Sequence, residues 1–261
     1  MERHIIFFDI DGTIIDEKTG VIPESTKEAI RMARENGHIL FINTGRCQAI
    51  WPEEILDLGF HGVIGGCGTH IVYEGKELFH RILPKDLCEE IRDDLLTWHI
   101  DGVLEGRDCT YFRKDRFYPV VEEIYEKGIY RSSNLKYWDD ENIIYDKMAL
   151  WHDESSRMDM FREKYSSRFS FILRDPNFYE VVPKGLSKAT GMDWIINYLG
   201  IPKENTVAVG DSANDIPMFE YANTTIGIKS DKTDVLKLVD VVTDTVLEDG
   251  VYHGLQKIGL I

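Results

Sequence analysis

The sequence predicts an α/β fold, a doubly wound, Rossmann-like parallel sheet into which an α+β unit is inserted. Short apolar runs alternate with helical stretches at both ends of the chain, as expected for parallel strands joined by helical crossovers. Between about residue 84 and residue 183 the alternation gives way to aromatic and charged segments. A chain of 261 residues has room for a self-supporting core and an insert of about 100 residues.

The first predicted element is a buried strand at His4–Phe8, which ends in the polar run Asp9–Thr13. A helix is expected over Pro23–Asn36, because proline is tolerated at a helix start and Gly37 is a typical stop. A second strand is expected at His38–Ile42. Next come a strand at Gly62–Ile64 and a hairpin of Ile71–Tyr73 with Leu78–Ile82 about Glu74-Gly75-Lys76.

The insert begins with an acidic helix, Asp86–Trp98, followed by segments at Cys109–Arg113, Ile143–Trp151 and Phe169–Leu173. After Lys184 the alternation of strands and helices returns. One helix is marked by Ala189, Met192, Ile195, Ile196 and Leu199, and strands are expected at Thr206–Val209, Thr224–Ile228 and Val239–Val242. We therefore expect a core of residues 1–82 and 184–261 and an inserted domain of residues 83–183.

Charge and cysteine content limit the function. Thirty basic and 46 acidic residues give a net charge of −16, which disfavours nucleic-acid and membrane partners and means that local groups must overcome this field if a phosphate-bearing ligand binds. The four cysteines form no C-x-x-C pair and no zinc pattern, so reduced thiols are expected. No apolar run is long enough for a signal peptide or a membrane span. We expect a cytoplasmic protein, either a monomer or a small homo-oligomer.

Polar side chains follow several predicted strands or begin a helix. They are Asp9 and Asp11, Thr44 and Arg46, Lys188, and Asp211, Asn214 and Asp215. In a parallel sheet these groups meet at the carboxyl edge, where ligands bind. Two adjacent carboxylates are costly to bury without a cation, and oxygen ligands without imidazole or thiolate suit Mg²⁺. Such a set supplies what phosphoryl transfer needs: a nucleophile, a proton donor and groups that hold the phosphoryl oxygens.

Four ordered motifs resemble those of the haloacid dehalogenase superfamily. They are Asp9-Ile10-Asp11-Gly12-Thr13, Thr44-Gly45-Arg46, Lys184-Gly185-Leu186-Ser187-Lys188 and Gly210-Asp211-Ser212-Ala213-Asn214-Asp215-Ile216-Pro217-Met218. The chain is most similar to the Cof-like sugar-phosphate phosphatase branch, whose members end in a tail like Leu247–Val251. The resemblance implies a haloacid dehalogenase-like core with a cap domain.

The resemblance also implies a role for each motif residue. Asp9 would attack phosphorus to form an aspartyl-phosphate, and Asp11 would act as general acid and then as general base. Asp9, the main-chain carbonyl of Asp11, and Asp211 would hold Mg²⁺, while Thr44, Gly45, Lys188 and Asn214 would bind the phosphoryl group. Asp215 would orient Lys188 or a metal-bound water. Arg46 would either contact phosphate or pair with an acidic neighbour, and Lys184 would be solvated.

Motif spacing places the cap. Thr44 follows Thr13 by 31 positions, too few for a cap as well as a core helix and strand, whereas Lys188 follows Arg46 by 142 positions. The insert of residues 83–183 is therefore similar to the family's second-position α/β cap. Such a cap would exclude water and supply the contacts to the leaving group.

One position departs from the family pattern. Relatives usually carry Asn-Gly after the third core strand, and this chain has Cys67-Gly68. A nucleophilic Cys67 has no paired histidine in sequence, so a buried or loop thiol is expected. The sequence thus predicts a Mg²⁺-dependent phosphatase of a small phosphorylated metabolite. A phosphomutase and a metabolite-binding regulator without turnover remain the alternatives.

Overall fold

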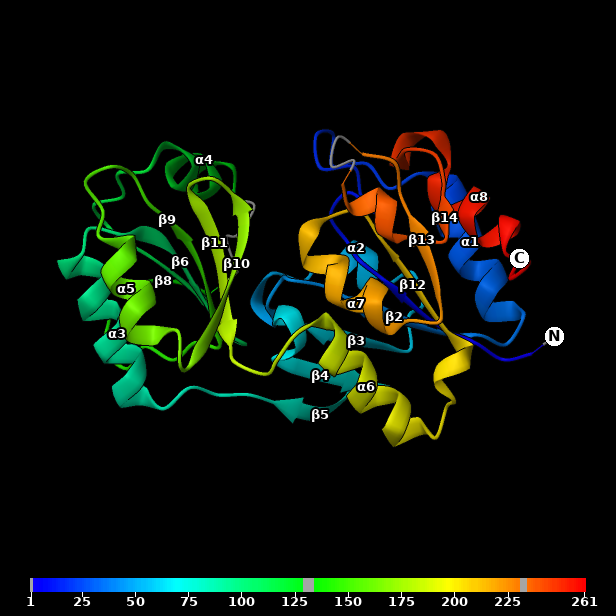
Figure 1. The fold of residues 1–261 in the computed structure, drawn as a ribbon, viewed down its shortest axis with the longest axis horizontal. Helices are drawn as coiled ribbons and strands as arrows, with labels where there is room; N and C mark the ends of the chain where they lie inside the picture. The colour runs from blue at the N-terminus through cyan, green and yellow to red at the C-terminus, as the bar shows by residue number, and fades with distance from the viewer. Residues whose placement is uncertain (1, 129–133, 231–233) are drawn as a thin grey trace. The chain divides into compact units, whose positions relative to one another are not determined.

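The computed structural model describes residues 2–128, 134–230 and 234–261. The chain divides into two compact units. The core unit comprises Met1–Gly45, Pro52–Leu78 and Ser187–Ile261, and the cap unit comprises Arg46–Trp51 and Phe79–Leu186. Figure 1 shows the strands and helices of both units.

The core unit is built on an eight-stranded sheet of order β14-β13-β12-β1-β2-β3-β4-β5. From β14 to β3 neighbouring strands are parallel, and β4 pairs antiparallel with β3. The strands are β1 (Ile5–Phe8), β2 (Ile39–Asn43), β3 (Gly62–Gly65), β4 (His70–Tyr73), β5 (Lys76–His80), β12 (Thr206–Gly210), β13 (Thr224–Gly227) and β14 (Val241–Val242). The predicted doubly wound parallel sheet is confirmed.

Helices cover the sheet in two groups. Helices α1 (Glu24–Glu35) and α8 (Gly250–Lys257) pack against each other, and so do α6 (Lys188–Leu199) and α7 (Ile216–Tyr221) (Figure 1). A short helix, α2 (Glu53–Leu56), follows β2. Helix α1 buries Ala29, Ile30 and Ala33, the spacing that places apolar side chains on one helix face.

Strand register brings three chain segments to one level of the core sheet. Phe8 of β1 pairs with Ile42 of β2 on one side and with Val209 of β12 on the other. All three strands are buried throughout, so they read as continuous apolar runs. The residues that follow them therefore leave the sheet side by side, at the point where the strand order changes direction.

The cap unit contains a six-stranded sheet of order β10-β11-β9-β6-β7-β8. Its strands are β6 (Asp101–Glu105), β7 (Thr110–Phe112), β8 (Leu135–Tyr137), β9 (Lys147–Trp151), β10 (Phe169–Asp175) and β11 (Phe178–Pro183). Its helices are α3 (Lys85–Thr97), α4 (Pro119–Lys127) and α5 (Met158–Tyr165). The predicted acidic helix is α3. The predicted segments Cys109–Arg113 and Ile143–Trp151 contain β7 and β9, and the predicted segment Phe169–Leu173 lies within β10, which continues to Asp175.

Two hydrophobic layers lie on opposite faces of the cap sheet. On one face α3 and α5 pack against β6, β9 and β11 through residues such as Ile91, Phe161 and Leu104. On the other face α4 packs through Val121 and Ile124. Because side chains alternate along a strand, the sheet has no solvated face over these regions.

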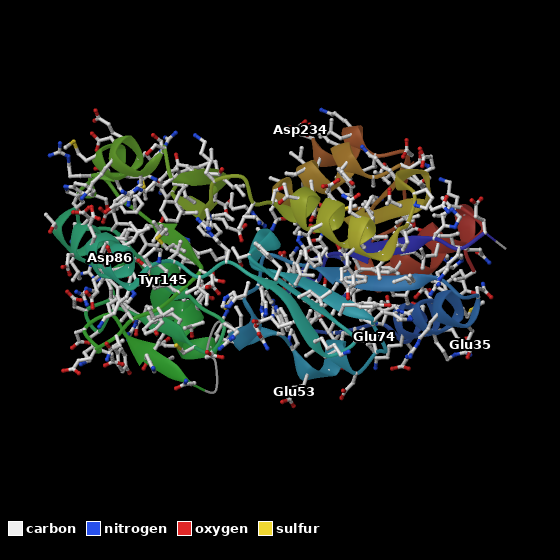
Figure 2. The ribbon with its side chains drawn as sticks, turned by 90° about the horizontal axis from the view of Figure 1, so that it is seen from below. Glu35, Glu53, Glu74, Asp86, Tyr145 and Asp234 are labelled. Atoms are coloured by element: carbon white, nitrogen blue, oxygen red, sulfur yellow. The ribbon has the colours of Figure 1, made fainter. Side chains whose placement is uncertain are left out.

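Many of the acidic residues lie at the surface, although Asp9, Asp211 and Asp215 are buried. The five acidic side chains labelled in Figure 2, namely Glu35, Glu53, Glu74, Asp86 and Asp234, are exposed, whereas Tyr145 in the same view is fully buried. Within the described residues, no helix has both the length and the apolar character needed to cross a bilayer.

Candidate active site

Asp9 follows β1 directly and is almost completely buried. Its N–H donates to the carbonyl of Val209 in β12 at 2.9 Å, which continues the ladder by one residue. The chain then turns tightly, because the N–H groups of Thr13, Ile14 and Ile15 all donate to the carbonyl of Ile10. This turn holds the Asp9 carboxylate at the edge of the sheet.

Gly12 allows the loops after β1 and β12 to approach each other. Its φ is +78°, and a Cβ atom added there would lie 2.6 Å from Asp211 Oδ2. Only glycine combines this left-handed backbone with so little space. The Asp-Gly pair of the first motif therefore positions the carboxylate of the fourth motif.

Lys188 links the first, third and fourth motifs. It is the first residue of α6, which is capped by reciprocal bonds between Ser187 and Thr190. Its Nζ donates to Asp9 Oδ1 and to Asp215 Oδ1, both at 2.5 Å, and its side chain is fully buried. By contrast Lys184 is exposed and donates to the Ser166 carbonyl at 3.2 Å. Of the two lysines of the third motif, Lys188 is thus the one in the acidic cluster.

Asp215 has both carboxylate oxygens engaged. Oδ1 accepts from Lys188, and Oδ2 accepts from the N–H groups of Asp211 and Ser212, each at 2.9 Å. These bonds fix the loop after β12 and aim the lysine at Asp9. Asp215 is therefore placed to position the Lys188 side chain.

The electrostatics of this site favour a bound cation. Burial raises the pKa of the Asp9 carboxyl; Lys188 opposes the shift, and the nearby Asp215, Asp211 and Asp11 add to it. Burial alone would lower the pKa of the Lys188 ammonium, but Asp215 and Asp9 outweigh it and the pKa lies above its ordinary value. Lys188 is thus a single positive charge among several carboxylates, so the net charge of the cluster is negative.

The residues present fit a hard divalent ion. Ligand oxygens of Asp9, Asp211 and Asp215 lie within 4.8 Å of one another, and all three residues are buried. Because Asp215 is saturated by hydrogen bonds, Asp9 and Asp211 are the better ligands of the three. Carboxylate oxygens of this kind suit Mg²⁺.

Thr44 follows β2 and is buried. Its N–H donates to the Ile64 carbonyl and its carbonyl accepts from the Cys67 N–H, at 2.8 and 3.0 Å. The second motif is thereby fixed against β3 and the turn after it. Gly45 is the last residue of the first segment of the core unit. Arg46 belongs to the cap unit, where its carbonyl accepts a hydrogen bond from the Trp51 indole N–H at 3.1 Å.

Asn214 lies in the turn between β12 and α7. It is buried, and its amide oxygen accepts from the Ser212 hydroxyl at 2.8 Å. This bond directs the amide within the fourth motif.

Two further residues support the site. Asn43, the last residue of β2, donates to the main-chain carbonyl of Lys188 at 3.2 Å and so ties β2 to the start of α6. The sequence shows this polar residue at the end of an apolar strand, but Asn43 was not among the predicted site residues. Cys67 is buried at a positive φ of 53°, near enough to contribute to the pKa of Lys188. The expected buried thiol is confirmed.

Comparisons with known proteins agree with this geometry. The family model for haloacid dehalogenase-like hydrolases matches residues 6–255. YkrA of Bacillus subtilis, whose phosphatase assignment is provisional, is 26% identical over 265 residues and all of both chains. The 5-amino-6-(5-phospho-D-ribitylamino)uracil phosphatase YitU of the same bacterium is 25% identical over 97% of each chain.

Solved structures lead to the same family. The structure of the haloacid dehalogenase subclass IIB sugar phosphatase BT4131 superposes with a TM-score of 0.85 at 25% identity, covering 99% of this chain and 100% of that one. The match spans both the core and the cap. The resemblance inferred from the four motifs is confirmed, and the chain belongs to the haloacid dehalogenase-like hydrolase family as an enzyme of its phosphatase type.

Proposed function

We propose that this enzyme hydrolyses a small phosphorylated metabolite, with a sugar phosphate as the leading candidate, through a Mg²⁺-dependent aspartyl-phosphate mechanism. The observation that carries the proposal is the buried cluster in which Lys188 contacts Asp9 and Asp215 beside Asp211. A nucleophilic carboxylate, a second carboxyl group in the same loop and a buried cation are the groups that phosphoryl transfer requires.

In the first step a carboxylate oxygen of Asp9 attacks phosphorus, and the bond to the leaving oxygen breaks. Asp11, half-buried two residues later, donates a proton to that oxygen, so the product leaves as an alcohol. In the second step Asp11 takes a proton from water, the water oxygen attacks phosphorus, and inorganic phosphate leaves with the Asp9 carboxylate restored. Lys188, Thr44, Gly45 and Asn214 would hold the phosphoryl oxygens, and Arg46 is a further candidate contact.

Asp9, Asp211 and the main-chain carbonyl of Asp11 would hold Mg²⁺. The ion would offset negative charge on the phosphoryl oxygens as the leaving bond breaks. Asp215 would keep Lys188 aligned through its contact at 2.5 Å. Removal of the ion should therefore weaken catalysis without removing any residue that fixes the loops.

The substrate class rests on the relatives. BT4131 is described as a sugar phosphatase and YitU as a phosphatase of a phosphorylated ribityl compound, so both act on phosphate esters of sugar-like chains. We propose a cytoplasmic location, since the four cysteines are buried and form no disulfide with one another, as in a reducing compartment. A monomer or small homo-oligomer, without nucleic-acid or membrane partners, is proposed from the charge of −16.

The test is Mg²⁺-dependent phosphate release from a panel of sugar phosphates, nucleotides and pyridoxal phosphate. Asp9→Asn should abolish release and still fold, while the matched variant Asp57→Asn, which changes an exposed carboxylate, should keep full activity. Full turnover by Asp9→Asn would refute the mechanism. Isomer formation without phosphate release would establish a phosphomutase, and ligand-induced stabilisation without turnover would establish a binding regulator.

A further inference from the structure

Ser212 is a buried polar residue of the fourth motif that the proposed reaction does not use. Its backbone is extended, with φ −132° and ψ 173°, a conformation that alanine adopts as readily as serine. Its N–H donates to Asp215 Oδ2 at 2.9 Å, a main-chain bond that an alanine in its place would keep. The turn therefore does not depend on the serine hydroxyl for its backbone geometry.

The Ser212 hydroxyl has a single hydrogen and two candidate acceptors. Oδ1 of Asn214 lies 2.8 Å from the hydroxyl oxygen, whereas Oδ2 of Asp215 lies 3.5 Å away. The nearer distance is the usual one for such a bond, at about 2.7–2.8 Å. Asp215 Oδ2 also accepts from the main-chain N–H groups of Asp211 and Ser212. The hydroxyl hydrogen is therefore donated to the amide oxygen of Asn214.

This bond selects one of the two orientations of the Asn214 amide. A carboxamide carries an acceptor oxygen at one end and two N–H donors at the other, and a half-turn of the group exchanges them. With Oδ1 bound by Ser212, the NH₂ group is directed away from the serine. The exchanged orientation would leave the hydroxyl hydrogen only the contact at 3.5 Å to Asp215. Asn214 is 6% exposed, and a hydrogen bond among buried groups restrains such a turn more than one in water.

The orientation decides whether Asn214 attracts or repels a phosphoryl group. Phosphoryl oxygens are acceptors that carry negative charge, so they are bound by N–H donors. The oxygen end of the same amide would oppose them. A residue that holds the amide oxygen elsewhere thus makes Asn214 a donor to the phosphoryl group.

We propose that Ser212 is a positioning residue, whose hydroxyl fixes the Asn214 amide with its N–H groups towards the phosphoryl oxygens. The inference rests on the proposed function, in which Asn214 holds the phosphoryl group. It adds to that function a residue that does not touch the substrate and acts only through Asn214.

The test is a double-mutant cycle of Ser212→Ala, Asn214→Ala and the variant with both changes. Calorimetric titration with inorganic phosphate and Mg²⁺ measures binding, and kcat/KM for phosphate release is measured on the same proteins. Ser212→Ala alone should weaken phosphate binding about fivefold, the effect of losing one hydrogen bond. In the Asn214→Ala background the same change should have an effect of less than about twofold, because the amide on which the hydroxyl acts is gone.

Two further variants serve as controls. Ser212→Thr keeps the hydroxyl and should bind phosphate within about twofold of the unchanged protein. Ser25→Ala removes a hydroxyl that donates to Asp249, outside the four motifs, and should leave binding unchanged. Denaturant titration checks that each variant folds.

Equal weakening by Ser212→Ala with and without Asn214 would overturn the inference, since the serine would then act on the loop and not on the amide. Unchanged phosphate binding in folded Ser212→Ala or in Asn214→Ala would overturn it as well, as would an unchanged protein that binds no phosphate. Coupled phosphate binding in a protein that releases no phosphate from any ester would support the inference and refute the proposed hydrolysis.

Discussion

Lys188 lies fully buried between Asp9 and Asp215, within 2.5 Å of each. Substitution by methionine would leave these carboxylates buried without their cation, and breaking such a pair costs about 3–5 kcal/mol. We predict that Lys188→Met loses phosphate release and lowers the free energy of unfolding by about that amount. Denaturant titration and a phosphate assay measure the two effects. Lys184→Met, at an exposed lysine of the same motif, should change neither, and an active, stable Lys188→Met would contradict the account.

Asp9 predicts a pH dependence of stability in metal-free protein. Its pKa is raised in the folded state, first by burial and further by neighbouring carboxylates. The folded protein therefore keeps a proton that the unfolded chain releases, so this group makes stability fall as the pH rises above about 4. We predict that the fall is smaller in Asp9→Asn. Denaturation over a pH series with chelator measures it, and equal slopes in the two proteins would argue against the raised pKa.

The metal ligands predict an opposition between stability and activity. Asp211 belongs to the buried carboxylate cluster with Asp9 and Asp215, and its charge helps to raise the pKa of Asp9. Neutralising it relieves repulsion in the metal-free state, so Asp211→Asn should raise the melting temperature with chelator. Mg²⁺ should stabilise the unchanged protein and not this variant. An equal Mg²⁺ response would remove Asp211 from the proposed ligands.

At the scale of elements, the turn after β1 depends on the space at Gly12. A Cβ atom there would lie 2.6 Å from the Asp211 carboxylate, whereas one at Gly20, whose φ of +69° is similar, meets nothing within 4 Å. Both alanine substitutions carry the same kind of backbone strain, so their comparison isolates the displacement of Asp211. We predict that Gly12→Ala reduces kcat far more than Gly20→Ala does. Similar kcat values in the two variants would show that the position of Asp211 does not matter.

The cap sheet carries a buried ion cluster on the face that α4 shares. Lys147 of β9 lies 2.8 Å from Glu105 of β6 and 3.1 Å from Glu180 of β11. Burial raises the pKa of Glu105, and Lys147 opposes that shift. Lys147→Met should therefore destabilise the protein by about 3–5 kcal/mol, while Lys127→Met, at an exposed lysine, should stay within about 0.5 kcal/mol. Chemical denaturation of both variants decides the matter.

The elements that sequence predicted well are those with one dominant pattern. The apolar runs before Asp9 and Asp211 became β1 and β12, and the helix after Pro23 became α1. Strand β6 begins with Asp101 and ends with Glu105. Its sequence therefore lacks the continuous apolar run that predicts a buried strand. Asp101 is satisfied by the N–H groups of Phe117 and Tyr118, and Glu105 by Lys147. Partners so distant in sequence cannot be inferred from a local pattern.

The site shows the same division between local and distant signals. The four motifs identified Asp9, Lys188 and Asp211 because each is marked by its own short pattern. Asn43 acts through the main chain of Lys188, a contact across 145 positions, and has no motif. The grouping of Arg46–Trp51 with the cap unit depends on packing as well, so no sequence pattern indicates it.

At the scale of the whole molecule, the net charge of −16 opposes the approach of an anionic substrate. Screening reduces this long-range repulsion, since the Debye length falls to about 8 Å at physiological ionic strength. We predict that kcat/KM for a sugar phosphate rises with added sodium chloride at fixed Mg²⁺. A neutral salt series at constant pH measures it. A steady decrease would show that local cations, rather than the net charge, control the encounter.

The most direct test of the mechanism is detection of the phosphoryl group on Asp9. In Asp11→Asn, p-nitrophenyl phosphate can still transfer its phosphoryl group, because its leaving group needs no proton, but the intermediate has lost its general base. Rapid acid quenching followed by peptide mass spectrometry should find one phosphoryl group on the peptide that contains Asp9, and none when Asp9→Asn is added. Rapid turnover with no adduct on that peptide, or an adduct on another residue, would contradict the account.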